Sequence, residues 1–148
     1  MNRIFLFAII FLSAISIPSC KKERAGDENI IEKWKLQTII NSWGPSINAE
    51  DMRYAQYITL YADSTFKKER TEIDPRLQTT GKYTYETEPY PQGAVEYLVL
   101  IFDNADNSLM DINNEGENRE YYTKRSGFLT GSRKMWADVP IYKYQIVK

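Results

Sequence analysis

Hydrophobic and polar residues alternate with a period of two along much of this chain. The alternation is clear in residues 82–86 and 142–146, where tyrosines occupy one face and polar residues the other. Such a pattern predicts half-buried strands. Residues 56–62 carry bulky side chains on both faces, so something apolar or aromatic should cover each side. Residues 96–102 form the most hydrophobic segment of the domain and are rich in β-branched and aromatic residues, which predicts a central strand.

Turn-forming residues separate these runs at regular spacing. They lie at residues 62–64, 80–81, 89–93, 103–107, 113–116 and 126–127. Evenly spaced strands with almost no helical pattern predict an all-β protein, either an up-and-down antiparallel barrel or a sandwich. The one helical piece that we predict is a short turn over residues 28–32, just before the first strand.

The first twenty residues have the features of an export signal. Residues 4–17 contain no charge, and this run is too short to span a bilayer comfortably but suits a signal-peptide core. It ends in Ile-Pro-Ser-Cys, which resembles the lipobox of bacterial lipoproteins. The resemblance implies cleavage before Cys20 and a diacylglycerol on that cysteine, which is the only one in the chain. The alternative is an uncleaved anchor helix followed by a free thiol.

We therefore predict three segments. Residues 1–19 form a signal peptide, residues 20–29 carry the lipid and form a flexible tether, and residues 30–148 form one domain. Lys21 follows the cysteine, which resembles outer-membrane rather than inner-membrane lipoproteins. We expect a chain held by its lipid in the bacterial cell envelope, on the outer membrane.

Charge and composition narrow the function. Without residues 1–19 the chain loses only Arg3 among its charged residues and keeps 18 basic against 20 acidic residues, which argues against nucleic acid as a partner. Histidine is absent, and lipidation leaves no free thiol. The commonest general base, the usual nucleophile pairs and the usual zinc ligands are therefore missing. We expect no catalysis, no cofactor and no metal.

One pair of acids is compatible with acid/base chemistry. Glu72 and Asp74 have alternate spacing, which would place both on one strand face, and Glu69 is close by. More often such acids belong to a solvated, charge-paired strand edge, which is how we interpret residues 67–76.

Residues 111–116 mimic the first half of a calcium loop. Asp111 and Asn113 supply oxygen ligands at alternate positions, and Gly116 suits the turn. Tyr122 stands where the bidentate glutamate belongs. A hairpin loop rich in turn-forming residues explains this segment equally well.

The order of the predicted strands resembles a known family. Trp34 stands near the start of a strand over residues 33–40, and about twenty residues later residues 57–66 form a strand, a tight turn and a second strand. Gly81 then opens another strand, and residues 142–147 end the chain on one. This order resembles the lipocalin-like domains of small bacterial lipoproteins over residues 30–148. The resemblance implies an eight-stranded barrel whose mouth holds one small apolar or amphipathic ligand.

Aromatic residues supply the candidate ligand contacts. All eleven tyrosines lie between positions 54 and 144, and tyrosine combines a large apolar body with a hydroxyl that can orient a ligand. Most should simply fill strands, and we select Tyr57, Tyr61, Tyr83 and Tyr85 as residues that line the barrel. Trp43, in the long connection after the first strand, would act as a lid over the mouth or plug the barrel as core.

Two functional hypotheses follow. The first is a lipid-anchored, non-catalytic binding module for a small hydrophobic or amphipathic molecule. The alternative is a protein-interaction or inhibitor module whose barrel is filled and docks another envelope protein. Bulky residues on both faces of residues 97–102 favour a filled interior, whereas Thr59, Thr84 and Gln145 would give a cavity its polar groups.

Overall fold

The computed structural model describes part of the chain in detail, namely residues 29–71, 77–104, 109–111, 118–131 and 139–148. Several sequence predictions lie outside these residues. They are the signal peptide with Cys20, all of the tether before Asn29, the Glu72 and Asp74 pair, and the calcium-like loop beyond Asp111. These stay predictions.

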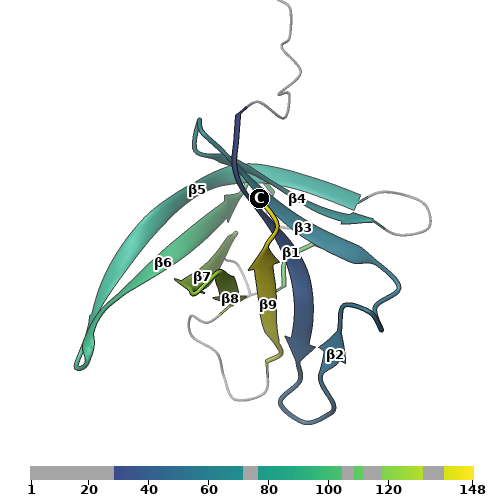
Figure 1. The fold of residues 1–148 in the computed structure, drawn as a ribbon. Helices are drawn as coiled ribbons and strands as arrows, with labels where there is room; N and C mark the ends of the chain where they lie inside the picture. The colour runs from purple at the N-terminus through teal and green to yellow at the C-terminus, as the bar shows by residue number, and fades with distance from the viewer. Residues whose placement is uncertain (1–28, 72–76, 105–108, 112–117, 132–138) are drawn as a thin grey trace, which may run out of the picture.

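The described residues form nine strands in one antiparallel sheet. The strands are β1 (Ile30–Ile40), β2 (Ile47–Asn48), β3 (Ala55–Tyr61), β4 (Thr65–Thr71), β5 (Leu77–Tyr90), β6 (Gly93–Phe102), β7 (Arg119–Arg125), β8 (Phe128–Gly131) and β9 (Ile141–Ile146). β1 pairs with β3, each later strand pairs with the next, and β9 pairs back onto β1 (Figure 1). β2 is a short addition to β1. The predicted all-β, antiparallel, up-and-down barrel of eight strands is therefore confirmed.

Two local predictions differ from the structure. β1 already begins at Ile30, so residues 30–32 are strand and not part of a helical turn; pairing with β3 satisfies backbone groups that one isolated turn could not. Gly81 does not open a strand, because it lies inside β5. A Cβ at this position would lie 2.1 Å from the carbonyl oxygen of Ile101 and 2.7 Å from Cε1 of Phe66, so the close approach of β6 and a ring requires glycine.

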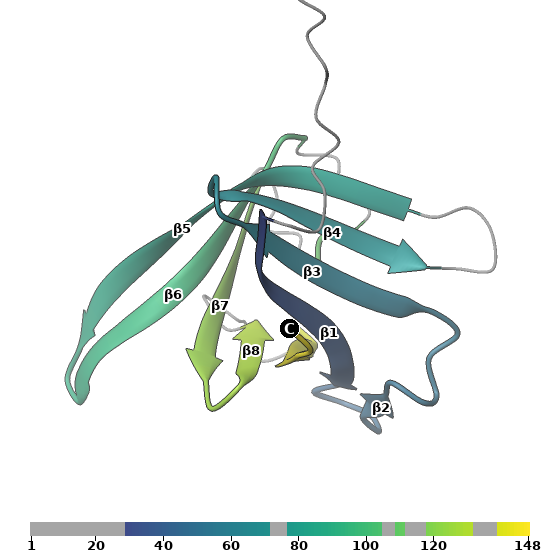
Figure 2. The same ribbon diagram turned by 45° about the horizontal axis from the view of Figure 1, so that its top comes forward.

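The two ends of the barrel differ. Because neighbouring strands run in opposite directions, β1, β4, β6 and β8 all end at one side, which we call the loop end. The opposite side, the turn end, carries short turns at residues 62–64, 91–92 and 126–127. Figure 2 shows β5 and β6 as a long hairpin that runs past the shorter β7 and β8.

The interior is filled by the protein's own side chains. Trp34 of β1 is 0% exposed there, and buried inward residues of six other strands, β3, β4 and β6–β9, pack with it. β5 adds the partly buried Tyr83. Phe66 and Phe102 meet edge to face, with ring centroids 5.0 Å apart, and Tyr122 and Tyr144 do so at 5.8 Å. Such contacts add to the stabilisation from burying the rings themselves.

β6, the segment predicted as a central strand, is buried on both faces. Leu98 and Leu100 point into the barrel, while Tyr97 and Val99 belong to a second buried group with Tyr121 on the outer face. Burial on both faces explains why the sequence of β6 is an almost continuous run of apolar residues.

Candidate functional site

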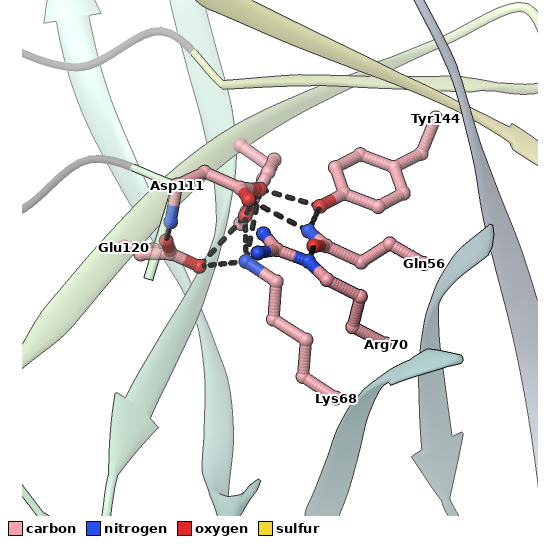
Figure 3. Close-up of polar contacts among 7 residues, drawn as sticks. Gln56, Lys68, Arg70, Asp111, Glu120 and Tyr144 are labelled. Atoms are coloured by element: carbon pink, nitrogen blue, oxygen red, sulfur yellow. Dashed lines mark hydrogen bonds and ion pairs between the residues drawn. The ribbon is translucent and has the colours of Figure 1, made fainter. Parts of the chain in front are cut away.

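A lysine lies inside the barrel and is paired there with two acids. Side chains alternate between the faces of β4, and this alternation points Lys68 inward, where it is 0% exposed. Its Nζ lies 2.9 Å from Oδ2 of Asp111 and 2.9 Å from Oε2 of Glu120 (Figure 3). A buried ammonium requires such partners, because its desolvation is otherwise very costly.

Asp111 is the centre of a hydrogen-bond network. Nε2 of Gln56 donates to Oδ1 over 2.7 Å, and the hydroxyls of Tyr122 and Tyr144 donate to Oδ2 over 2.8 and 2.5 Å. Burial, followed by the charge of Asp111, raises the pKa of both tyrosines well above the usual value, so their hydroxyls stay protonated and donate. We call the two acids, Lys68 and these three donors the buried cluster.

Glu120 ties the β6–β7 connection to the barrel wall. Its Oε1 accepts a hydrogen bond from the backbone N–H of Asp111. Leu109 is buried as well, so residues 109–111 lie across the interior at the loop end. Burial raises the pKa of Glu120, and the charge of Lys68 opposes that shift. The buried cluster therefore closes the interior beneath the loop end.

Arg70 lies beside the buried cluster and is held in a defined orientation. Its Nε donates to Oε1 of Gln56 over 2.9 Å, while Nε2 of the same amide donates to Asp111 (Figure 3). Its guanidinium carbon lies 4.3 Å from the ring centroid of Tyr54, which is a cation–π contact. Unlike Lys68, Arg70 is only partly buried.

An open hollow of about 390 Å³ lies at the loop end, next to Tyr54. It lies where β1 leaves β3 to pair with β2. Its lining combines apolar side chains with two cations and consists of Lys35, Leu36, Ala49, Met52, Arg53, Tyr54, Ala55 and Thr71. This combination suits a small amphipathic molecule, whose apolar body and polar group need both kinds of neighbour.

The structure does not bring the predicted ligand residues together. Tyr57 and Tyr61 alternate with the buried Ile58 and Leu60, so they lie on the outer face of β3 and do not line the interior. Tyr57 instead lies beneath Nζ of Lys33, 5.1 Å from its ring centroid. The register of β3 decides which face is inside, and the sequence shows bulky residues on both.

The other three predicted residues are divided between the two ends. Tyr83 and Tyr85 lie on the inner face of β5 toward the turn end, with ring centroids 6.0 Å apart, and the Tyr83 hydroxyl donates to the Tyr61 carbonyl. Trp43 follows β1 at the loop end and is 84% exposed, so the alternative that it plugs the barrel is wrong. A role for these residues in ligand binding stays a prediction.

Sequence reasoning missed the buried cluster. We interpreted residues 67–76 as a solvated, charge-paired edge, and Lys67 does pair with Glu69 at 2.7 Å. However, Lys68 and Glu69 are buried, so the interpretation as a solvated edge is wrong for these two residues. The sequence contained one indication of this burial. Lys68 lies two residues after Phe66 and therefore on the same strand face, and an apolar residue such as Phe66 is typical of an inner face.

Asp111 also differs from its expected setting. In a calcium loop its carboxylate would be an oxygen ligand of the ion, but here the carboxylate points into the barrel toward Lys68. Within the described part of the chain, no group of three or more metal-ligating acids, cysteines or histidines is close enough to hold an ion.

A comparison of the chain with protein-family models, with curated proteins and with solved structures found no match. No helix among the described residues has the length and apolar character needed to cross a membrane.

Proposed function

We propose that this chain is a lipid-anchored, non-catalytic binding module of the bacterial cell envelope, and that its ligand binds at the loop end and not in the barrel interior. One observation carries this proposal: the interior is filled beneath the buried cluster, whereas the loop end keeps an open hollow of about 390 Å³. The ligand is a small amphipathic molecule, because the hollow offers Leu36 and Met52 beside Lys35 and Arg53.

Native mass spectrometry of the full chain, purified gently from its own host's envelope, tests the ligand. A co-purifying small molecule is the expected result. The matched variant is Met52→Asp, which places a charge in the hollow away from the buried cluster and should release the ligand. Retention of the molecule by this variant, or a clean apoprotein mass for the parent chain, would count against the site.

The anchor has a separate test. Cys20→Ala should abolish fatty-acid labelling and membrane fractionation, because only the Cys20 thiol can accept the diacylglycerol. Ser16→Ala leaves the cysteine and the apolar run intact and should keep both. Recovery of the Cys20→Ala chain in the outer-membrane fraction would refute the lipid anchor.

A second candidate is a protein-interaction or inhibitor module with a filled barrel. The complete burial of Trp34, Tyr122 and Tyr144 favours it, because such a barrel has no need of an interior ligand. Chemical crosslinking in the envelope would yield one reproducible protein partner if this candidate is correct, and Trp43→Ala at the exposed loop end would weaken that crosslink.

A further inference from the structure

Arg70 differs from Lys68 in whether a carboxylate pairs with its charge. Lys68 touches both Asp111 and Glu120, whereas within the described residues no carboxylate lies at ion-pair distance from Arg70. Among the residues that the structure describes, Nε of Arg70 is its one nitrogen with a hydrogen-bond partner, the Oε1 of Gln56. The two terminal nitrogens of a partly buried guanidinium are therefore available as donors.

The orientation of this guanidinium is already set. The hydrogen bond from Nε and the Tyr54 ring hold it from two directions, at 2.9 Å and 4.3 Å. A planar guanidinium held in this way presents its remaining N–H groups as a fork, which matches the two oxygens of a carboxylate or phosphate. Little side-chain entropy is then left to lose on binding.

A second donor lies near by. Tyr142, from β9, packs partly buried against the core, and its hydroxyl makes no hydrogen bond to the described residues. Burial, followed by the charge of Asp111, raises the pKa of Tyr142 to about 12, and Arg70 lowers it. Tyr142 shares the inner face of β9 with Tyr144 and lies nearer the loop end, and Tyr144 and Arg70 both bond to the amide of Gln56. The Tyr142 hydroxyl stays protonated as a donor.

The surrounding charges permit an anion at this point. Asp111 bonds to the same Gln56 amide as Arg70, and its oxygens already accept from Lys68, Gln56 and two tyrosines. Lys35 and Arg53 line the hollow together with Tyr54 and add positive potential at the loop end.

We propose that Arg70 and Tyr142 form an oxyanion-binding site at the loop end, and that the ligand of this module carries a carboxylate or a phosphate. This inference rests on the proposed function and specifies the polar group of its ligand. The apolar body of the same molecule lies in the hollow next to Tyr54.

Isothermal titration calorimetry of the full chain tests this site with three probes: butyrate, inorganic phosphate and neutral butyramide. Saturable binding of butyrate or phosphate, with no binding of butyramide, is expected. The anion that binds more tightly identifies the ligand as a carboxylate or a phosphate compound. Arg70→Gln should weaken that binding about tenfold or more, since one charged hydrogen-bond pair is lost.

Two further variants keep the test decisive. Arg119→Gln is the matched control, because it removes the same charge from an exposed residue paired with Glu86 at 3.6 Å, and it should leave binding unchanged. Arg70→Lys keeps the charge without the fork and should bind more weakly than the parent. Circular dichroism confirms that each variant is folded.

The outcomes separate this inference from the proposed function. Unchanged anion binding by Arg70→Gln would overturn the Arg70 site. Butyramide binding as tightly as butyrate would keep a binding module but also overturn the anion site. Binding of no probe at millimolar concentration would overturn the site, and together with a clean apoprotein mass it would count against the binding module as well.

Discussion

Lys68 is a cation buried inside the barrel, and it is paired with two carboxylates. A buried ion pair adds little net stability over well-packed apolar residues, but removing one partner leaves a charge that nothing compensates. The contacts of Lys68 with Asp111 and Glu120 therefore matter mostly when they are broken.

Replacing Lys68 by methionine should destabilise the fold by about 3–5 kcal/mol, because Asp111 and Glu120 would face each other without a cation. Urea unfolding followed by tryptophan fluorescence measures this change. Lys82→Met, on the exposed outer side of β5, is the matched control and should alter stability by about 0.5 kcal/mol or less. Equal stability of the two variants would contradict the role assigned to Lys68.

Glu120 should make stability depend on pH. Burial raises its pKa above the ordinary value of 4.5, so the folded chain holds this proton more tightly than the unfolded chain does. Its contribution to stability is therefore fully present below pH 4.5 and is lost as the pH rises through the raised pKa. Glu120→Gln cannot titrate, so its unfolding free energy should fall less steeply than that of the parent above pH 4.5. Parallel curves for the two chains over this range would exclude the effect.

At the scale of elements, the close contact between β5 and β6 depends on one glycine. β5 passes over Ile101 and Phe66 at Gly81, where no side chain fits. From the sequence we predicted that this glycine opens a strand. A glycine in a turn and a glycine required by a close backbone approach cannot be distinguished without knowledge of the partner strand.

Gly81→Ala should destabilise the barrel by about 1–3 kcal/mol, because its Cβ overlaps backbone that cannot move without disturbing the β5–β6 ladder. Thermal unfolding by circular dichroism measures the loss. Gly44→Ala adds the same methyl group where the nearest atom is 4.0 Å away, and should change stability by about 0.5 kcal/mol or less. A Gly81→Ala chain as stable as the Gly44→Ala chain would show that β5 can shift freely.

At the scale of the whole molecule, closure of the barrel joins the two ends of the domain. β9 pairs with β1 over residues 141–146, and Tyr144 brings its hydroxyl into the buried cluster. A last strand is often a frayed edge, but here it has partners on both sides, β8 and β1.

Hydrogen exchange should reflect this closure. Backbone amides of β9 that bond to β1 or β8 should exchange as slowly as those of β3, because both open only with the barrel. The amides of β2, a two-residue strand on one side of β1, should exchange much faster. Mass-spectrometric exchange of the full chain compares these segments directly. Equally fast exchange in β9 and β2 would mean that the barrel opens at this seam.

The sequence by itself determined the class of fold. Period-two alternation and evenly spaced turns depend only on near neighbours, so they predicted the strands, and the apolar run in β6 predicted a central strand. Cys20 and its apolar leader likewise predict an export signal from local pattern alone.

Only the tertiary structure decided which faces are inside and which charges meet. Lys68, Asp111 and Glu120 come from β4, a loop and β7, so no local pattern connects them. Tyr57 and Tyr61 lie outside because the register of β3 assigns Ile58 and Leu60 to the core. The physical reason is that strand periodicity defines two faces, whereas long-range pairing selects one of them for the interior.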